Sequence, residues 1–417
     1  MKRFKISPGG RLYGEVYAAG SKNSALPILA AAALSEKSSE IYNCPDISDI
    51  RNTVEILKYL GCGAEFEDGT VTVDPHGMDK YDIPYVMMEE MRSSIIFLGT
   101  LLARFGRAEI SMPGGCDLGP RPIDIHVGAL KKMGAEFLEY NGFLYAEAQE
   151  LRGANIQLPI ASVGATENIM LAAATARGRT AIYNAAREPE IVDLAEMLTG
   201  MGAKIMGAGS GIMEIDGVKE LQGASHTVIP DRIEAATIIS AALITGGTVT
   251  VKGVIGEHLQ SVTDIFEKAG AEITVKKTLM TVKSPPKLLP VSRIITAPYP
   301  GFPTDCQPVI TAMLSVADGV SLMSERVFDS RFKYINELYR MGADIYVDDK
   351  TAVILGNSKL TGARTSAPDL RGGAALVIAA LASSGKSEIE NIHHIERGYE
   401  ALDKKLSELG ADITVSN

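Results

Sequence analysis

Two kinds of helical pattern alternate along the chain. Segments such as Ala25–Leu34 and Pro308–Val316 are apolar on all sides and rich in small residues, which predicts helices buried all round. Segments such as Ile191–Met201 and Val262–Ala269 carry apolar residues at three- and four-residue spacing, which predicts amphipathic helices. Short β-branched runs separate the helices. The pattern is therefore that of an α/β protein.

The pattern also repeats six times. Each amphipathic segment is followed by a Gly-Ala pair, where glycine is the expected left-handed helix stop, and then by a β-like run. The pairs are Gly63-Ala64, Gly134-Ala135, Gly202-Ala203, Gly270-Ala271, Gly342-Ala343 and Gly410-Ala411, at spacings of 71, 68, 68, 72 and 68 residues. Asp68-Gly69 between two β-like runs predicts a hairpin. We therefore expect six βαβαββ-like repeats of about 70 residues. The six expected buried helices are Ala25–Leu34, Ser94–Ala103, Asn168–Ala176, Glu234–Leu243, Pro308–Val316 and Ala374–Ala382.

A chain of 417 residues exceeds what one hydrophobic core usually supports, so we expect two domains. The sixth repeat ends soon after Gly410-Ala411 without a return strand, whereas strand-like segments at Arg3–Ile6 and Arg11–Tyr17 precede the first repeat. An unpaired strand edge is a liability, so we expect the N-terminal segment to complete the last repeat. This gives one three-repeat domain over residues 22–229 and a second over 1–21 plus 230–417. A solenoid is the alternative.

Composition narrows the class of protein. The net charge of -10 argues against a nucleic-acid or anionic-membrane binder. Four scattered cysteines form no CxxC pair, and histidine is sparse, so we expect no metal site and a reducing compartment. The N-terminus lacks a signal-peptide core, and the longest apolar runs have about half the length of a membrane-spanning helix. We expect a cytoplasmic protein that does not insert into membranes.

Polar and charged residues gather where the buried helices begin. They are Lys22-Asn23, Arg92, Ser162-Val163-Gly164, Asp305 and Asp369-Leu370-Arg371. Helix N-termini bind anions through free N–H groups and the helix dipole. Helix capping alone could explain Asp305 and Asp369. It does not explain Lys22 or Arg92, because a cation is disfavoured there unless an anion offsets the cost. Plain surface charge is the alternative for those two.

The segment from Pro113 to Pro122 holds three glycines and three prolines and is expected to be a loop. It contains Cys116. An accessible thiol there can act as a general acid or as a nucleophile. The alternative is a buried, inert cysteine, which suits Cys44 or Cys62 better.

These motifs together resemble the enolpyruvyl transferases over essentially the whole chain. The resemblance is carried by Gly20-Ser21-Lys22-Asn23, the Cys116 loop through Arg121-Pro122-Ile123-Asp124-Ile125-His126, Ser162-Val163-Gly164-Ala165-Thr166-Glu167, Pro303-Thr304-Asp305, Arg331, Asp369-Leu370-Arg371-Gly372-Gly373 and Arg397. It implies two similar inside-out α/β barrel domains, each of three repeats, with substrate bound in the cleft between them.

The resemblance also implies the reaction. The enolpyruvyl group of phosphoenolpyruvate would pass to the 3′-hydroxyl of UDP-N-acetylglucosamine by addition and elimination, the first committed step of peptidoglycan synthesis. Cys116 would be the acid at C3 and Asp305 the base, while Lys22, Arg121 and Arg397 would hold the phosphate. The implied substrate contacts are Lys22, Asn23, Arg92, Arg121, Pro122, Ile123, Asp124, Ile125, Ser162, Val163, Gly164, Asp305, Val327, Arg331, Asp369 and Arg371.

We expect no cofactor, no metal and a monomer. Fosfomycin would inactivate the enzyme through Cys116. One alternative within the fold is a 5-enolpyruvylshikimate-3-phosphate synthase, which lacks the loop cysteine. Another is a non-catalytic sugar-nucleotide sensor, which would be expected to have lost Cys116, Asp305 or Lys22; this chain has all three.

Overall fold

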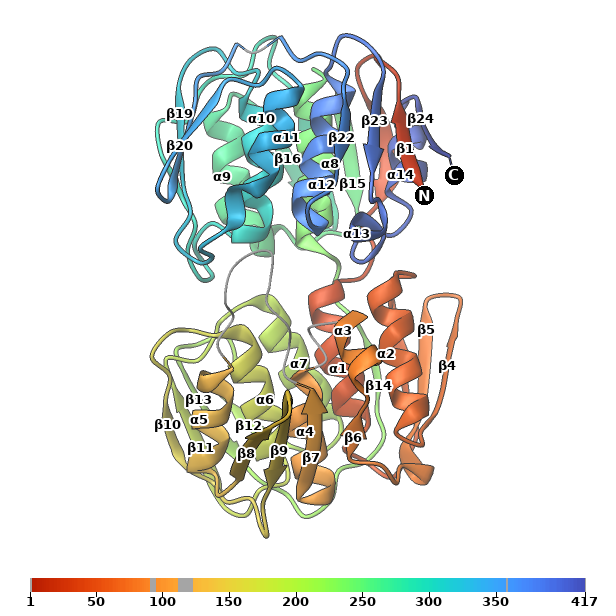
Figure 1. Ribbon diagram of the computed structural model, residues 1–417, viewed down its shortest axis with the longest axis vertical. Helices are drawn as coiled ribbons and strands as arrows, with labels where there is room; N and C mark the ends of the chain where they lie inside the picture. The colour runs from red at the N-terminus through yellow and green to blue at the C-terminus, as the bar shows by residue number, and fades with distance from the viewer. Residues whose placement is uncertain (1, 91–94, 112–122, 358, 417) are drawn as a thin grey trace. The chain divides into compact units, whose positions relative to one another are not determined.

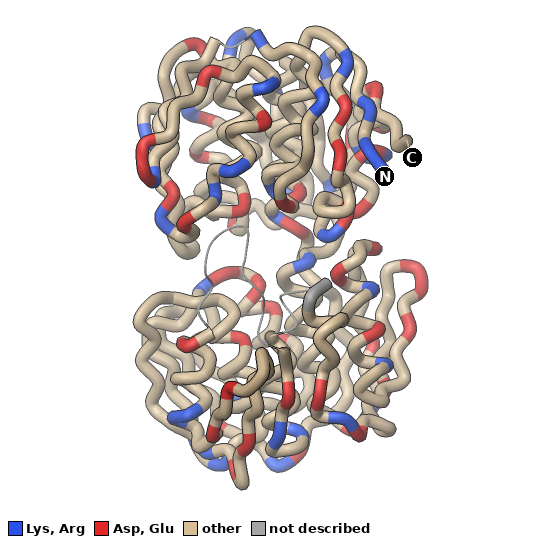
Figure 2. The backbone as a smooth tube through the Cα atoms, in the orientation of Figure 1, with Lys and Arg blue, Asp and Glu red and all other residues tan. Residues whose placement is uncertain are grey.

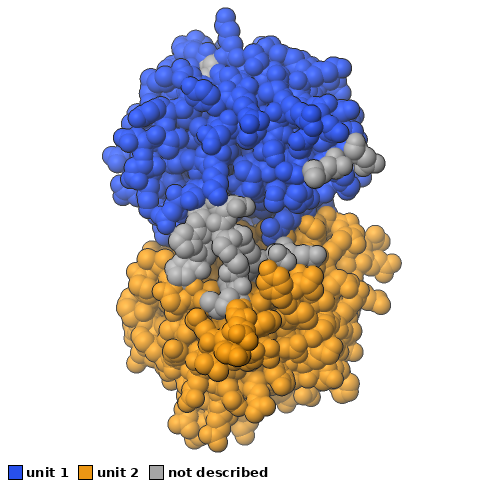
Figure 3. Space-filling model, viewed as in Figure 1, with its two compact units in different colours: residues 1–19, 116–120, 230–417 blue, residues 20–115, 121–229 orange. Residues whose placement is uncertain are grey.

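The computed structural model describes residues 2–90, 95–111, 123–357 and 359–416 (Figure 1). Four of the residues singled out in the sequence, Arg92, Cys116, Arg121 and Pro122, lie outside these ranges. The chain divides into two units (Figure 3). Among the described residues, unit 1 takes those up to 19 and from 230 onward, and unit 2 takes those between 20 and 229. The sequence led us to expect the first boundary two residues later, between 21 and 22.

Unit 2 contains three repeats. Its helices are α1 (Lys22–Ala32), α2 (Ser48–Tyr59), α3 (Tyr85–Glu90), α4 (Phe97–Phe105), α5 (Asp124–Lys132), α6 (Val163–Ala173) and α7 (Pro189–Gly200). Its strands are β3 (Ser39–Tyr42), β4 (Gly63–Glu67), β5 (Thr70–Asp74), β6 (Asp82–Ile83), β7 (Arg107–Ser111), β8 (Glu136–Tyr140), β9 (Phe143–Glu147), β10 (Asn155–Gln157), β11 (Arg179–Tyr183), β12 (Lys204–Met206), β13 (Ile212–Asp216) and β14 (Ser225–Thr227).

Unit 1 contains the other three repeats. Its helices are α8 (Arg232–Ile244), α9 (Gln260–Lys268), α10 (Gln307–Leu314), α11 (Ile335–Arg340), α12 (Leu370–Leu381), α13 (His393–Glu396) and α14 (Leu402–Glu408), and the short 3₁₀ helices η4 (Thr304–Cys306) and η5 (Arg331–Tyr334) precede α10 and α11. Its strands are β1 (Arg3–Ile6), β2 (Tyr13–Tyr17), β15 (Thr248–Lys252), β16 (Glu272–Lys276), β17 (Leu279–Lys283), β18 (Ile294–Ile295), β19 (Ser321–Ser324), β20 (Ile345–Asp348), β21 (Thr351–Ile354), β22 (Arg364–Ser366), β23 (Ser387–Glu390) and β24 (Ile413–Ser416).

Every repeat builds one four-stranded sheet in the same order. The strand after the buried helix pairs in parallel with an edge strand on one side and antiparallel with a pair of strands on the other, as in β10-β11-β13-β12. That pair is a hairpin in each described sheet except the sixth, where β1 and β24 form it. This confirms the expected βαβαββ repeat. Among the described residues the strands form six separate sheets, so the helices are enclosed without a continuous ring of strand hydrogen bonds.

At each passage of the chain from one unit to the other, the last strand before the crossing stays in the sheet of the unit that the chain is leaving. β2 directly precedes α1 in sequence but pairs with β15 in unit 1, and β14 directly precedes α8 but pairs with β3 in unit 2. The sixth sheet takes β1 from the N-terminus, which lies between β23 and β24, so the two ends of the chain meet in one sheet (Figure 1).

The all-apolar segments are the core helices, as predicted. In unit 1, α8, α10 and α12 pack against one another and are buried almost completely (Figure 1). In unit 2, α4 packs against α1 and α6. Small side chains let these helix backbones approach closely, and Gly99 in α4 faces the backbone oxygen of Asn168 at a distance that leaves no room for a Cβ.

The Gly-Ala pairs expected at the ends of the amphipathic helices are confirmed in five repeats and need correction in the first. Gly134, Gly202, Gly270, Gly342 and Gly410 all adopt positive φ after their amphipathic helices, as a left-handed stop requires. In the first repeat the stop is Gly61, with φ of 100°, whereas Gly63 belongs to β4. The expected register of this repeat was therefore wrong by two residues, because Cys62 stands where the other repeats have alanine.

Charged residues of both signs are spread over each unit (Figure 2). Over the described ranges, no helix is long and apolar enough to cross a membrane.

Candidate functional site

Asp305 in unit 1 lies between two buried arginines. It belongs to η4, just before the core helix α10. Its Oδ1 accepts a hydrogen bond from Arg331 Nη2 at 3.0 Å, and its Oδ2 accepts from Arg371 Nη2 at 3.2 Å and from Arg371 Nε at 3.3 Å. Both arginine side chains are 2% exposed, whereas that of Asp305 is 27% exposed. The two guanidinium groups fix the orientation of a carboxylate that still reaches solvent.

The Arg371 side chain is itself held by Tyr399, which is hydrogen-bonded to Thr237. Its guanidinium lies over the ring of Tyr399, 5.1 Å from the centroid, and the Tyr399 hydroxyl is 2.9 Å from Thr237 Oγ1 in α8. Burial raises the pKa of Tyr399, so the phenol stays protonated and can donate to Thr237. Arg371 is thus anchored to two core helices.

Asp369 and Asp305 differ in what their carboxylates do. Asp369 is the N-cap of α12 and accepts from the backbone N–H groups of Arg371 and Gly372, both at 3.0 Å. The capping interpretation is therefore right for Asp369. It is wrong for Asp305, whose 3₁₀ helix has Pro303 at its N-cap and no side-chain cap.

The remaining candidates of unit 1 lie on surface segments. Val327 is 42% exposed and follows β19, and its backbone N–H donates to Glu325. Arg397 is half-buried at the C-terminal end of α13, two residues before Tyr399.

Lys22 in unit 2 is the first residue of α1, and Asn23 follows it. Lys22 Nζ lies 2.9 Å from Asp49 Oδ2, with side chains 12% and 1% exposed. Asp49 stands in the first turn of α2. The cost of a cation at a helix N-terminus is offset here by a buried carboxylate. Sequence reasoning missed Asp49, because an acidic residue in the first turn of an ordinary helix needs no special explanation.

Ser162, Val163 and Gly164 form the start of α6, where Ser162 Oγ accepts from Ala165 N at 3.4 Å. Gly164 lies against His126 of α5, and an added Cβ would meet His126 Cε1 at 3.1 Å. Ile123 is the N-cap of α5, and Asp124 and Ile125 are its first residues. The packing of His126 thus joins the candidate residues at the start of α5 to those at the start of α6.

His126 is neutral. Burial lowers its pKa to about 4, and its Nδ1 is 3.0 Å from Asn168 Nδ2, which fixes Nδ1 as the acceptor. Asn168 also donates to the carbonyls of Ile95 and Gly164 and accepts from Gly99 N at 2.7 Å. This one amide ties the starts of α4 and α6 to α5.

The described cysteines are inert. Cys44, Cys62 and Cys306 are buried free thiols, and burial raises the pKa of each to about 12. This confirms the interpretation of Cys44 and Cys62 as buried residues. Cys306 is next to Asp305 in sequence, but it points into the core of unit 1.

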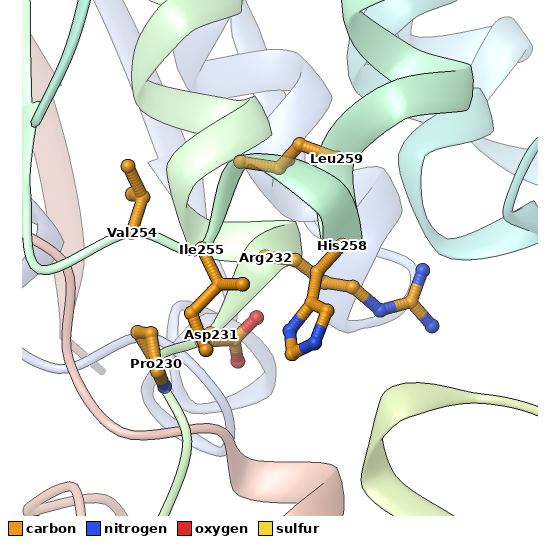
Figure 4. A pocket seen from close by; sticks show the side chains of 7 residues that line it. All are labelled: Pro230, Asp231, Arg232, Val254, Ile255, His258 and Leu259. Atoms are coloured by element: carbon orange, nitrogen blue, oxygen red, sulfur yellow. The ribbon is translucent and has the colours of Figure 1, made fainter. Parts of the chain in front are cut away.

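A small pocket lies at the start of α8, where Asp231, Arg232 and His258 are among the lining residues (Figure 4). Asp231 Oδ1 accepts from Ile233 N at 2.7 Å and Glu234 N at 3.1 Å, so it caps the helix. We assign no ligand to this pocket.

Comparison with known proteins places the chain in a family. The profile of the family described as EPSP synthase (3-phosphoshikimate 1-carboxyvinyltransferase) matches residues 6–406. A UDP-N-acetylglucosamine 1-carboxyvinyltransferase 2 from Caldanaerobacter subterraneus subsp. tengcongensis is 49% identical, and a UDP-N-acetylglucosamine 1-carboxyvinyltransferase from Geotalea uraniireducens is 46% identical. In each case the match covers 99% of both chains.

Solved structures agree in fold. The enolpyruvyl transferase NikO from Streptomyces tendae superposes with a TM-score of 0.91 at 28% identity, covering 100% of this chain and 99% of the other. EPSP synthase from Acinetobacter baumannii superposes with a TM-score of 0.79 at 20% identity, covering 100% of both chains, which supports the fold alone. The chain therefore belongs to the enolpyruvyl transferase family and, within it, groups with the UDP-N-acetylglucosamine 1-carboxyvinyltransferases.

Proposed function

We propose that the protein transfers the enolpyruvyl group of phosphoenolpyruvate to the 3′-hydroxyl of UDP-N-acetylglucosamine and releases phosphate. Full-length relatives at 46–49% identity carry the name of this activity. The structural observation that supports it best is the Asp305 carboxylate, partly exposed and oriented by two buried arginines.

The chemistry is an addition followed by an elimination. The sugar hydroxyl oxygen bonds to C2 of phosphoenolpyruvate while C3 gains a proton. The C2–O bond to phosphate then breaks, C3 loses a proton, and an enol ether remains. Asp305 accepts the proton of the hydroxyl, and Cys116 supplies the proton to C3. Such transfers contribute about 10²–10⁴-fold each.

Phosphoenolpyruvate is strongly anionic, so several cations must converge on it. We assign Lys22, Arg121 and Arg397 to its phosphate, with Asn23 nearby. We assign the UDP-sugar to Arg92, to the segment from Arg121 to Ile125, to Ser162 through Gly164, and to Val327. Arg331 and Arg371 complete the set and hold Asp305 in place, and Asp369 caps the helix that carries Arg371. Residues of both units would then serve one reaction.

The proposal also covers the biological role. The product would enter peptidoglycan synthesis, and the enzyme would act in the cytoplasm. The location is supported by the free thiols of Cys44, Cys62 and Cys306, which are typical of a reducing compartment.

Acceptor dependence tests the proposal. Phosphate release from phosphoenolpyruvate should require UDP-N-acetylglucosamine. Release that requires shikimate 3-phosphate instead would assign the chain to the other activity of the family. No release with either acceptor would contradict both assignments.

A further inference from the structure

Glu325 is a buried carboxylate directly after β19 that accepts four hydrogen bonds. Its side chain is 1% exposed. Oε1 accepts from Val327 N at 2.7 Å, Phe328 N at 3.1 Å and Thr296 Oγ1 at 2.8 Å, and Oε2 accepts from Thr304 Oγ1 at 2.9 Å. A buried carboxylate is costly unless its lone pairs are satisfied, so these four donors make Glu325 a fixed point of unit 1.

The first arm of this network leads to Asp305 along the chain. Thr304 is the first residue of η4 and directly precedes Asp305. Its hydroxyl donates to Glu325 Oε2, so the turn that presents the Asp305 carboxylate is tied to a buried anchor. The side chain of Thr304 makes no other hydrogen bond that competes with this one among the described residues.

The second arm leads to the same aspartate through space. Glu325 holds the backbone N–H of Phe328, and the ring of Phe328 lies under the guanidinium of Arg331, 5.6 Å from its centroid. Arg331 donates to Asp305 Oδ1 at 3.0 Å. Glu325 also accepts a hydrogen bond from the backbone N–H of Val327, the residue that we have assigned to the UDP-sugar.

We propose that Glu325 is a positioning residue that sets the place of Asp305 from two sides and, through Val327, the acceptor-binding loop. The inference rests on the proposed function, in which Asp305 is the base. The Glu325 carboxylate is buried and accepts hydrogen bonds from protein donors, so we give it no direct role toward the substrate. It acts through Thr304, through the Phe328–Arg331 contact and through the Val327 backbone.

If Glu325 had only a structural role, its loss would lower stability but not change the kinetic constants of the folded enzyme. The test therefore measures kcat and KM, and it perturbs the Thr304 connection separately from the whole network. Thr304→Val removes the hydroxyl of the first arm and keeps the shape of the side chain. Because a misplacement of about 1 Å costs on the order of 10²-fold, we expect kcat to fall about tenfold or more, with the KM for UDP-N-acetylglucosamine nearly unchanged. Thr304→Ser retains the hydroxyl and should restore kcat to near wild type.

Glu325→Gln perturbs both arms and should lower kcat and also raise the KM for UDP-N-acetylglucosamine. Ser324→Ala is the control. Ser324 precedes Glu325, but its hydroxyl pairs with Thr351 Oγ1 at 3.0 Å, outside the network. It should leave both constants unchanged. Wild-type kcat in Thr304→Val, or an equal loss in Thr304→Ser, would overturn the proposal.

A second measurement does not depend on activity. Amide hydrogen exchange should quicken at residues 304–306 in both Thr304→Val and Glu325→Gln and stay unchanged in Ser324→Ala. Exchange equal to wild type in both variants would overturn the positioning role, even in an active enzyme. If wild type releases no phosphate with either acceptor, the proposed function fails, and exchange still decides whether Glu325 fixes the Asp305 turn.

Discussion

Lys22 and Asp49 form an ion pair of 2.9 Å in which both side chains are almost removed from solvent. The pair joins the first residue of α1 to the first turn of α2, 27 positions later in the sequence. It places a cation where the helix dipole alone would oppose one, and it holds the ammonium group that we assign to the phosphate of the substrate.

Replacing Asp49 with asparagine should destabilise unit 2, because it leaves a nearly buried ammonium group without its anionic partner. We expect the free energy of unfolding to fall by about 1–3 kcal/mol, measured by urea denaturation. Asp46→Asn is the matched control. Asp46 pairs with Arg51 on the surface, where side chains are 46% and 59% exposed, and it should cost less than about 1 kcal/mol. Equal losses in the two variants would refute the special role of the Lys22–Asp49 pair.

Arg371→Lys should impair catalysis more than folding. Lysine keeps the charge but cannot offer two nitrogens to Asp305 in a fixed plane, nor stack as well on the ring of Tyr399. We expect kcat to fall about 10–100-fold. Arg364→Lys is the comparison, because Arg364 also pairs with a carboxylate, that of Glu390, but is 67% exposed. It should behave as wild type, and an unchanged kcat in Arg371→Lys would show that the orientation of Asp305 does not depend on this contact.

Thiol labelling should be selective. Burial raises the pKa of Cys44, Cys62 and Cys306 to about 12, so their thiolate fraction at pH 7 is on the order of 10⁻⁵. Iodoacetamide should therefore modify the native protein once, at Cys116, as should fosfomycin. Mass spectrometry of labelled Cys116→Ala should find no adduct. A label on Cys306 in the native variant would contradict the burial that we describe.

Stability should fall with acid because of His126. Burial lowers its pKa to about 4 in the folded protein, below the ordinary 6.5, so the unfolded chain binds more protons between these values. This contribution is present above about pH 6.5 and is lost as the pH falls toward 4. Between pH 7.5 and 5 the wild type should lose about 2 kcal/mol more than His126→Asn does, as measured by urea denaturation at both pH values. Parallel losses in the two proteins would contradict a buried neutral histidine.

Local patterns in the sequence predicted the repeat and its core. The all-apolar segments became α1, α4, α6, α8, α10 and α12 because a helix without a polar face can only be buried. Asp68-Gly69 formed the hairpin turn between β4 and β5, with both residues at positive φ. The one error of register, Gly63 in place of Gly61, arose because a Gly-Ala pair inside a strand looks the same as one at a helix end.

The sequence predicted where the candidate residues stand relative to the helices, but not which side chains they bind. Asp305 and Asp369 both stand at the start of a core helix, yet only Asp369 is a cap, because two arginines 26 and 66 residues away occupy Asp305. The sequence did not point to Asp49 or Glu325 either, because their roles also depend on partners distant in sequence. Their partners are brought to them by the packing of separate elements, and no spacing along the chain records that contact.

Phosphate release from phosphoenolpyruvate, with and without UDP-N-acetylglucosamine, in the wild type and in Asp305→Asn, is the most direct test of the central claim. The account predicts release that depends on the UDP-sugar and that falls in the variant by about 10²-fold or more, since the base is lost while the shape is kept. Release that depends on the UDP-sugar but is undiminished in Asp305→Asn would contradict the role of the carboxylate that Arg331 and Arg371 hold.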